Sequence, residues 1–381
     1  MKRTFALIMV FITLLCMFGC GRSSTPTKGT AETPKTTKKD IPTLSIAYGD
    51  DLHCCMFNVA MIDVDSFANK TFRVNPLNET QGELIKDDEV IAQFNIIRGK
   101  TGAESATMMA QKNLDITLCS NTAMQSAYDV GTDVKILSPL HTSGVALVMA
   151  PDTDFYGFDA LKKHIQNSQT PFKIGYPSAI SGPRIVTEYV FKESGFTVTE
   201  DPGDLNADIL MVDLKGFQNV TSSINSGAVD AWAGTSPFQE NAVALGAGKI
   251  VLKLEDYPPQ GYWTDFPCCV LAARTDIIDK YPEAIEGIVN VVVDCVKYAN
   301  DNWEKFAEIN SPVIGFEEDV ILASNIIYTS VPSKEWVDGV EIYFDTIKSL
   351  GKFENRLKEA GFDKVKEEIF DFSFVEKANT R

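Results

Sequence analysis

Short apolar segments alternate with stretches of helical periodicity along most of this chain. The predicted strands of the first set are residues 43–48, 92–97, 115–118, 134–137 and 145–150. Small and apolar residues at helical spacing separate some of these strands, at 103–112 and 122–129. Strands that alternate with helices form parallel sheets covered on both faces. The sequence therefore predicts an α/β fold of mostly parallel sheets flanked by helices.

A second set of alternating segments follows the first. Its predicted strands are residues 172–176, 208–212, 231–233 and 268–273, with helices at 183–194 and 217–226. Beyond them the chain is mostly helical, with predicted helices at 277–307, 317–328, 333–350 and 355–360. The body from Thr43 to Arg381 is too long for one hydrophobic core, so the sequence predicts two lobes.

The chain begins with the pattern of an export signal. Lys2 and Arg3 precede an uncharged apolar run at residues 5–18, which is short for a permanent membrane span. The run ends at Gly19-Cys20, which resembles the lipobox of bacterial and some archaeal lipoproteins. We therefore expect residues 1–20 to be a lipoprotein signal peptide and Cys20 to be acylated; an ordinary secretory signal is the alternative.

A polar linker follows. Residues 21–42 are mostly Ser, Thr, Pro, Gly and Lys and offer almost nothing to bury, which predicts a disordered tether. A flexible coil of this length reaches on the order of 25 Å. Such a tether would hold the body near the outer face of the cytoplasmic membrane, on the extracellular or periplasmic side.

The charge balance excludes one class of partner. The formal net charge is −17, and the isoelectric point is about 4.7. Nucleic-acid binding needs a basic face, and none is visible in the sequence. An acidic body also adheres poorly to an anionic bilayer, so we expect membrane contact through the lipid anchor only.

Four motifs occur in an order typical of one family. They are Gly102-Ala103-Glu104-Ser105 with the strand entry Asp115-Ile116, the segments 131–137 and 224–231, and Thr235-Ser236-Pro237. Together they resemble the nitrate/taurine/aliphatic-sulfonate/thiamine-pyrimidine group of periplasmic binding proteins with type II topology. One departure lies at residues 63–88, where the family has an amphipathic helix and this chain is polar and rich in turn residues.

The resemblance implies a two-lobed receptor that captures a solute in its cleft for an ABC importer. Lobe one would comprise residues 43–150 plus 268–381, and lobe two residues 151–267. The partners would be a small molecule and the permease subunits, with no cofactor. Hinge closure would occur at two crossings, near Ala150-Pro151 and Phe266-Pro267.

Candidate binding residues follow from the strand ends, because ligands of open α/β sheets lie beyond the carboxyl ends of the strands. They are polar and mostly neutral: Asp51, His53, Cys54, Ser120, Asn121, Thr122, Thr142, Ser143, Ser178, Ser181, Gly182, Asp213 and Thr235. Each is also a residue type common in caps and turns. His141 likewise follows a strand; it and His53 are either pocket residues or hydrogen-bonded surface imidazoles.

Six cysteines remain after the signal segment. The adjacent pairs Cys54-Cys55 and Cys268-Cys269 lack zinc-finger spacing, so no metal site is predicted. The type II order implied by the resemblance puts the strand beginning at Cys268 beside the one ending near Cys119. On that implied order, Cys54 or Cys55 would lie at the same rim of the cleft. A disulfide between Cys119 and either Cys268 or Cys269 is one expectation, and buried free thiols that pack as small apolar residues are the other.

Two further function classes stay open. One is a thiol- or metal-dependent enzyme with a fold like thiamine-pyrimidine synthase, although no nucleophile–base spacing or phosphate loop is present. The other is a lipoprotein sensor. For a receptor, the only arginine near the predicted pocket is Arg184, which favours a neutral, zwitterionic or heteroaromatic solute. Trp232, Trp263, Tyr176 and Tyr262 are candidates to stack on it.

Overall fold

The computed structural model describes residues 41–380. The predicted signal peptide, the lipidation site Cys20 and residues 21–40 of the tether lie outside the described residues, so these expectations stay predictions. Within residues 41–380, no helix is both long enough and apolar enough to cross a bilayer.

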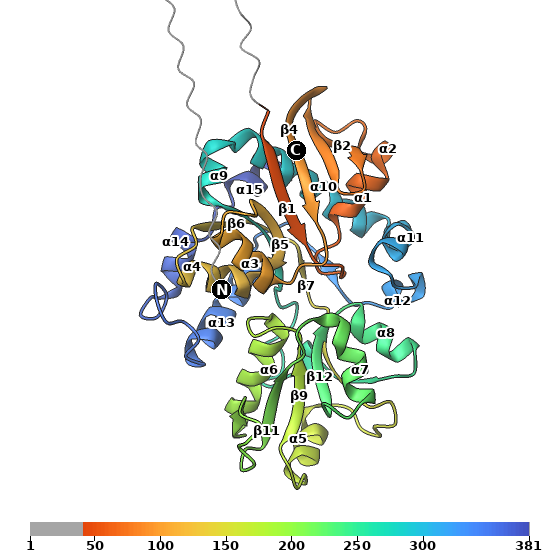
Figure 1. Ribbon diagram of the computed structural model, residues 1–381, viewed down its shortest axis with the longest axis vertical. Helices are drawn as coiled ribbons and strands as arrows, with labels where there is room; N and C mark the ends of the chain where they lie inside the picture. The colour runs from red at the N-terminus through yellow and green to blue at the C-terminus, as the bar shows by residue number, and fades with distance from the viewer. Residues whose placement is uncertain (1–40, 381) are drawn as a thin grey trace, which may run out of the picture. The chain divides into compact units, whose positions relative to one another are not determined.

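The first of two large sheets has seven strands in the order β2-β3-β4-β1-β5-β14-β6. Figure 1 labels β2, β4, β1, β5 and β6 of this sheet. At its centre β1 (Thr43–Tyr48) is parallel to both β4 (Glu89–Ile97) and β5 (Ile116–Ser120). The return strand β14 (Cys269–Arg274) inserts antiparallel between β5 and β6 (Val134–Pro139). This confirms the predicted neighbourhood of the return strand.

The edge of the first sheet is a hairpin in the segment where the sequence departs from the family. Strands β2 (Phe72–Asn78) and β3 (Gln81–Lys86) pair antiparallel, and β3 pairs with β4. Phe72, Val74 and Leu84 point into the core, while the turn between the strands is exposed. Alternating burial of this kind is the signature of a half-buried strand. The polar segment is therefore a sheet extension, and the only helix in residues 63–71 is the short α2 (Val64–Phe67).

The second sheet has six strands in the order β10-β11-β9-β12-β8-β13. Their bounds are Val198–Thr199 (β10), Ile209–Asp213 (β11), Phe172–Tyr176 (β9), Ala231–Thr235 (β12), Val145–Met149 (β8) and Lys249–Lys253 (β13). The expected lobe boundary at residue 150 assigned Val145–Met149 to the first lobe. Instead β8 is antiparallel to β12 and β13, because its fully buried Val-Ala-Leu-Val-Met run packs within the second sheet.

Helices cover both large sheets. The flanking helices of the first sheet are α1 (Phe57–Ile62), α3 (Gly102–Ala110), α4 (Asn121–Asp129), α9 (Thr275–Lys280), α10 (Pro282–Asp301) and α11 (Trp303–Ile314). Those around the second sheet are α5 (Phe158–Gln166), α6 (Gly182–Glu193), α7 (Val220–Asn225) and α8 (Phe238–Ala244). The largest cores lie on the two faces of the first sheet, and the one that includes α4 continues into the second sheet.

Two chain crossings connect the sheets and lie side by side. In the first, β7 (His141–Thr142) pairs with β15 (Ile327–Tyr328), and Ser143 and Gly144 adopt positive φ angles of 64° and 78°. The second crossing contains Phe266 and Pro267. The Ser143 N–H donates to the Phe266 carbonyl at 3.0 Å, and Thr142 and Pro267 form an antiparallel bridge. The crossing expected at Ala150-Pro151 therefore lies earlier, at residues 140–144.

The C-terminal helices are α12 (Glu318–Leu322), α13 (Lys334–Ser349), α14 (Phe362–Glu368) and α15 (Ser373–Asn379). The helix expected at 355–360 is absent from the described structure, where this segment forms turns. Asp129, at the end of α4, explains the difference. Its buried carboxylate accepts backbone N–H bonds from Glu354 at 2.9 Å, Asn355 at 3.2 Å and Leu357 at 2.7 Å. A side chain that satisfies these donors stabilises the turn against a helix.

We expect Asp129→Asn to reduce the free energy of unfolding by about 1–3 kcal/mol, because it replaces a buried acceptor of several backbone N–H bonds with an amide. Urea unfolding followed by circular dichroism measures the change. Asp133→Asn is the matched control, since Asp133 makes an exposed ion pair with Arg356 and should change stability by less than about 0.5 kcal/mol. Equal effects of the two substitutions would contradict the role of Asp129.

Candidate functional site

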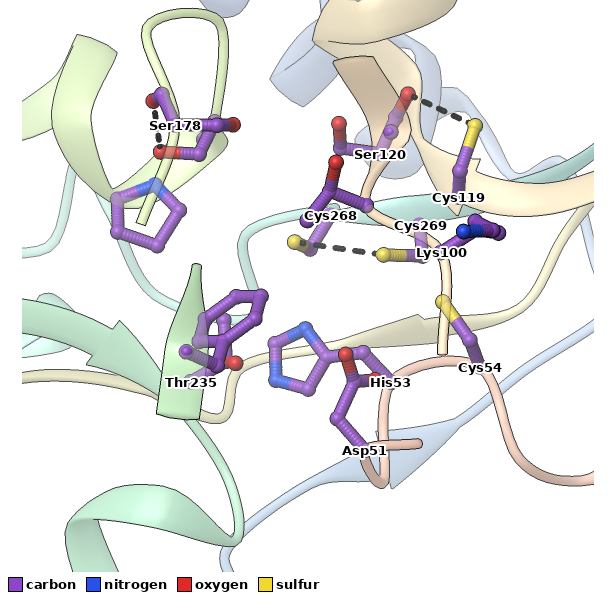
Figure 2. A pocket seen from close by; sticks show the side chains of 16 residues that line it. Asp51, His53, Cys54, Lys100, Cys119, Ser120, Ser178, Thr235, Cys268 and Cys269 are labelled. Atoms are coloured by element: carbon purple, nitrogen blue, oxygen red, sulfur yellow. Dashed lines mark hydrogen bonds between the residues drawn. The ribbon is translucent and has the colours of Figure 1, made fainter. Parts of the chain in front are cut away.

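A pocket with an internal volume of about 50 Å³ lies where the two sheets face each other. The first lobe lines it with Asp51, His53, Cys54, Lys100, Thr101, Gly102, Cys119 and Ser120, and the second lobe with Ser178, Ser181, Gly182, Pro183, Phe217 and Thr235. Cys268 and Cys269 complete the wall at the beginning of β14 (Figure 2).

Three helices begin at the pocket. Thr101 and Glu104 form a reciprocal capping box at the start of α3, Ser120 is the N-cap of α4, and Ser181 is the N-cap of α6. The first N–H groups of a helix carry partial positive charge and have no partner within the helix. The helix starts can therefore attract an electron-rich group of a solute. They do so through partial charges, and no charged side chain is needed at each helix start.

Close approach explains two of the glycines at these helix starts. A Cβ atom on Gly102 would lie 2.8 Å from the Ala123 side chain and 2.9 Å from the Ser120 hydroxyl. A Cβ atom on Gly182 would lie 2.8 Å from the Tyr343 hydroxyl. Both distances are too short for any other residue type without displacement of a neighbour, so glycine lets the helices converge on the pocket.

Three buried pocket atoms have no hydrogen-bond partner within residues 41–380: Asp51 Oδ1, His53 Nδ1 and Thr235 Oγ1. Burial raises the pKa of Asp51 to about 6, while the charge of His53 opposes the rise. Buried polar atoms in proteins are nearly always paired, and a bound ligand is one source of the missing partner. Since Asp51 belongs to the first lobe and Thr235 to the second, a solute that satisfies both would bridge the lobes.

Four side chains with metal-binding atoms meet at one side of the pocket. The donor atoms of His53, His141, Cys268 and Cys269 all lie within 4.8 Å of one another, and all four residues are buried. The two imidazole centroids are 4.1 Å apart, and the two thiol sulfurs are 3.8 Å apart. Contact with Cys269 and then with the two imidazoles lowers the pKa of Cys268 well below its ordinary value, against the effect of burial. Burial and the charge of His53 lower the pKa of His141 to about 4.

The structure brings most of the predicted site residues together. Eight of the thirteen nominated from the sequence line the pocket: Asp51, His53, Cys54, Ser120, Ser178, Ser181, Gly182 and Thr235. The other five, Asn121, Thr122, Thr142, Ser143 and Asp213, do not line it. Position at the carboxyl end of a strand therefore predicts many pocket residues. It does not distinguish a residue that lines the pocket from a neighbouring residue with a structural role.

Each of those five residues has a structural role that explains its position. Asn121 Nδ2 donates to the Cys268 carbonyl at 2.8 Å, and Thr122 Oγ1 donates to the Ile180 carbonyl of the other lobe at 2.8 Å. Thr142 and Ser143 lie in the first crossing. Asp213 accepts from the backbone and the side chain of Lys215.

The nominated binding residues leave out eight pocket residues: Lys100, Thr101, Gly102, Cys119, Pro183, Phe217, Cys268 and Cys269. The spacing of Thr101 and Glu104, Thr-x-x-Glu before a helix, is the signal that could have identified the first three, because it predicts a helix start. Pro183 lies at the first turn of α6, where proline is favoured. Phe217 follows a loop and carries no such signal.

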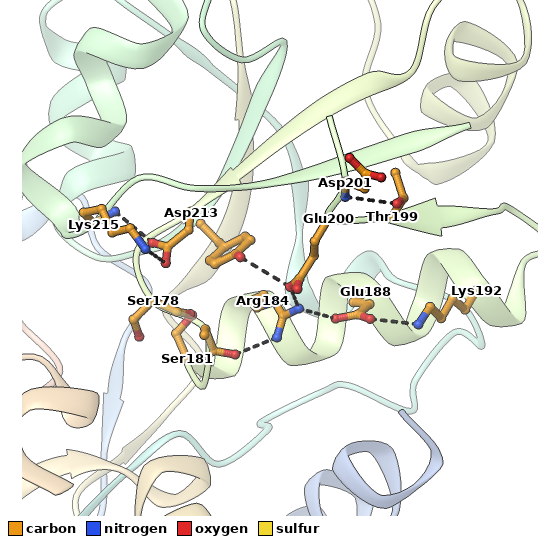
Figure 3. Close-up of polar contacts among 12 residues, drawn as sticks. Ser178, Ser181, Arg184, Glu188, Lys192, Thr199, Glu200, Asp201, Asp213 and Lys215 are labelled. Carbon is orange, nitrogen blue, oxygen red and sulfur yellow. Dashed lines mark hydrogen bonds and ion pairs between the residues drawn. The ribbon is translucent and has the colours of Figure 1, made fainter. Parts of the chain in front are cut away.

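Arg184, the arginine nearest the pocket in sequence, is withdrawn from it (Figure 3). Its guanidinium is buried, pairs with Glu188 at 2.9 Å and with Glu200, and donates to the Ala179 carbonyl at 2.7 Å. It also lies 4.9 Å from the centre of the Tyr176 ring. Both acidic partners compensate its charge, so Arg184 does not offer a free cation to a ligand.

The predicted stacking residues also lie elsewhere. Trp232 and Trp263 are fully buried in the core, and neither they nor Tyr176 and Tyr262 line the pocket. The aromatic side chain of the pocket wall is instead Phe217.

The predicted disulfide is not formed, and all six cysteines of the described chain are free and buried. The register explains this. On β14, Val270 lies opposite Cys119, and Cys269 lies opposite Ser120. Because side chains alternate between the two faces of a sheet, Cys119 and Cys269 point to opposite faces, while Cys268 precedes the strand and packs in a different core from Cys119. Cys119 accordingly packs in one core, and Cys54, Cys55, Cys268, Cys269 and Cys295 pack in the other.

Aromatic contacts connect the lobes beside the pocket. Phe238 of α8 stacks on Phe217 at 4.9 Å and meets Phe316 of the first lobe edge-on at 5.1 Å. Nearby, the Leu52 N–H donates to the Ser236 carbonyl at 3.3 Å. These contacts hold the two lobes together at the pocket rim.

Comparisons with known proteins agree with this architecture. The ligand-binding component of an ABC-type import system from Staphylococcus aureus, solved with zinc bound, superposes with a TM-score of 0.66 and 13% identity, over 88% of this chain and 99% of that chain. The periplasmic nitrate-binding protein of Synechocystis PCC 6803 gives a TM-score of 0.67 and 12% identity, over 90% of this chain and 89% of that chain. At these identities the likeness shows the fold, which is that of periplasmic binding proteins.

The sequence comparisons are consistent with that fold. An uncharacterized protein of Methanocaldococcus jannaschii is 27% identical over 154 residues, which are 39% of this chain and 97% of that protein. Residues 59–311 match the model of the NMT1-like family. Because this match covers more than half of the chain, and the structural neighbours include nitrate- and sulfonate-binding periplasmic proteins, the protein belongs to the NMT1-like family.

Proposed function

We propose that this protein is an extracytoplasmic receptor that captures a small polar solute between its lobes and delivers it to an ABC importer. The observation that supports the proposal most directly is the pair of unsatisfied buried atoms, Asp51 Oδ1 and Thr235 Oγ1, one in each lobe. A solute that bonds both atoms favours the closed form over the open one, which is how a two-lobed receptor couples binding to closure.

The pocket chemistry favours a zwitterionic or neutral solute. Three helix starts offer partial positive charge, and the only basic side chain in the wall is Lys100, which pairs with Glu104 at 3.4 Å. Asp51 supplies an acidic group on the same wall as Lys100. A solute with an electron-rich end toward the helix starts and a donor or cationic end toward Asp51 fits both features. A dianion would need a free arginine, and Arg184 is already paired twice.

The location proposed for this receptor is the outer face of the cytoplasmic membrane. It rests on the signal-like residues 1–20, on acylation of Cys20 and on the tether that follows. The structural neighbours, an import-system component and periplasmic binding proteins, agree with an extracytoplasmic setting. Membrane separation of the wild type from Cys20→Ser, which should be released, tests the anchor.

The competing function is a thiol- or metal-dependent enzyme, for which the cluster of His53, His141, Cys268 and Cys269 is the specific observation. His53 bonds to the Gly144 carbonyl through Nε2, which leaves its Nδ1 unpaired within residues 41–380, and both His53 and Cys268 line the pocket. We propose binding without turnover, because the structural neighbours are an import-system component and nitrate- and sulfonate-binding proteins. Chemical conversion of a bound solute by the purified protein would favour the enzyme.

The pocket assignment predicts the effect of Asp51→Asn on solute binding. In a thermal-shift screen of small amino acids, betaines, pyrimidines and sulfonates, at least one solute should raise the melting temperature of the wild type. Asp51→Asn should weaken binding of that solute at least roughly tenfold, because a charge-assisted hydrogen bond contributes about 1.5–3 kcal/mol.

The matched control for Asp51→Asn is Asp213→Asn. Asp213 was also nominated from the sequence, but it lies outside the pocket and binds Lys215, so its substitution should leave solute affinity unchanged. If the two variants lose affinity equally, or if no solute of the four classes binds, the pocket assignment is wrong.

The aromatic contact between the lobes predicts a second effect. Phe316→Ala removes the edge-on partner of Phe238 and should weaken solute binding roughly two- to tenfold, because such pairs contribute about 0.5–1.5 kcal/mol. Small-angle X-ray scattering should show a smaller compaction on solute addition than in the wild type. Phe374→Ala is the control, since Phe374 packs on the core of the first lobe away from the pocket. An unchanged scattering curve of the wild type with saturating solute would refute closure.

A further inference from the structure

We infer that His53, His141, Cys268 and Cys269 form a tetrahedral site for a thiophilic divalent cation, with zinc as the ion of best fit. The four side chains come from three segments: the loop after β1, the first crossing and the beginning of the return strand β14. The site goes beyond solute capture, because His141 lies behind the pocket wall and does not line it.

The distances match tetrahedral zinc coordination. For Zn–S bonds of about 2.3 Å at the tetrahedral angle, two thiolate sulfurs lie about 3.8 Å apart. The Cys268 and Cys269 sulfurs are 3.8 Å apart, far beyond the bond length of about 2.05 Å in a disulfide. All four donor atoms fall within 4.8 Å of one another, which lets one ion reach each of them with little movement. Two sulfur and two nitrogen ligands in this geometry are a combination that zinc favours.

The hydrogen bonds of the imidazoles orient them as ligands. His53 Nε2 donates to the Gly144 carbonyl at 3.0 Å, and His141 Nδ1 donates to the Thr142 carbonyl at 3.3 Å. A carbonyl only accepts, so these nitrogens carry the protons, and the lone pairs lie on His53 Nδ1 and His141 Nε2. Both of these nitrogens are buried, and neither makes a hydrogen bond within the described part of the chain. A backbone carbonyl on the far ring nitrogen is the usual second-shell arrangement of a histidine ligand.

Charge balance supports a divalent ion. Two thiolates and two neutral imidazoles carry a total charge of −2, which a divalent cation neutralises inside a buried site. Binding releases to solvent any proton that Cys268 or Cys269 still carries, as two sulfur–metal bonds form. Four protein ligands fill the tetrahedron, so the ion would be structural, with no open position for a substrate.

The location gives the ion a defined effect. His141 belongs to the first crossing, and Cys268 directly follows Pro267 of the second, the two strands that bridge at Thr142 and Pro267. His53 adds the loop that carries Asp51. A bound ion would therefore fasten both crossings to the pocket wall and fix the place about which the lobes rotate.

Metal titration of the full chain, reduced and freed of metal, tests the inference. We expect one equivalent of zinc per chain, a higher melting temperature with zinc, and no such response to magnesium or calcium. Cobalt as a probe should give the ligand-field bands of a tetrahedral site together with sulfur-to-metal charge transfer. Cys268→Ser and His141→Gln should each weaken zinc binding by more than about a hundredfold, since loss of a second-shell partner alone costs about 10–100-fold.

Two variants serve as controls. His164→Gln changes the remaining histidine, exposed on α5, and Cys295→Ala changes a buried thiol outside the cluster; both should keep the wild-type zinc affinity. If a cluster variant does not fold, X-ray absorption of the zinc-loaded wild type decides, with two sulfur and two nitrogen donors as the expected result. Absence of stoichiometric zinc in the reduced wild type, or a zinc site without sulfur, would overturn the inference. Solute binding is measured separately on the metal-free protein, so failure of one proposal is distinguishable from failure of the other.

Discussion

The insertion of β14 between β5 and β6 is the constraint on which the site depends. This one antiparallel strand joins the edge strand β6 to the rest of the first sheet, since its residues pair with β5 on one side and with β6 on the other. Because the strand arrives from the second sheet, its first residues must lie at the edge of the first sheet that faces the pocket. Cys268 and Cys269 are therefore fixed beside the end of β5, and the crossing that leads to them is paired with the first crossing at Thr142. The position of this one strand therefore determines both the pocket wall and the hinge.

Periodicity predicted the buried elements well, because a core imposes its pattern on the sequence. The bounds of β1 and β9 agree with the expectation from their alternating and apolar residues. The failures have tertiary causes. Residues 355–360 have helical spacing but form turns, because the Asp129 carboxylate satisfies their backbone donors from a distant helix. The run Val145–Met149 is apolar on both faces and fits either sheet, so only the actual pairing with β12 and β13 assigns it.

The candidate site was predictable where position alone decides it. Residues that directly follow parallel strands, such as Asp51 and Ser120, reach the pocket because the carboxyl ends of the strands meet there. Residues whose role depends on register were not predictable. A shift of one position turns a side chain to the other face, and this is why Cys119 packs away from Cys269 although their strands are neighbours. The cluster of His53, His141, Cys268 and Cys269 was not predicted, because its four residues come from three separate segments of the chain. No spacing within one segment indicates that they lie together in the fold.

The distribution of charge around the pocket explains how an acidic protein can still attract an electron-rich group. Arg184, the residue after the pocket residue Pro183, is buried and pairs with Glu188 and Glu200. Besides Lys100, which pairs with Glu104, the positive charge at the pocket is the partial charge of the starts of α3, α4 and α6, which is directional and falls off within a helical turn. This directional field favours ligands whose polar atoms are aligned with the N–H groups. An anion that is not aligned with them gains little binding energy from it. Asp51 adds to the ligand selectivity. One oxygen of its buried carboxyl group has no hydrogen-bond partner within residues 41–380, so a ligand that places an acceptor atom beside it binds less favourably. Ligand specificity in this pocket therefore depends on how the polar atoms of the ligand are placed relative to the fixed helix starts. The return strand β14, which continues from the second crossing, also sets the positions of these groups.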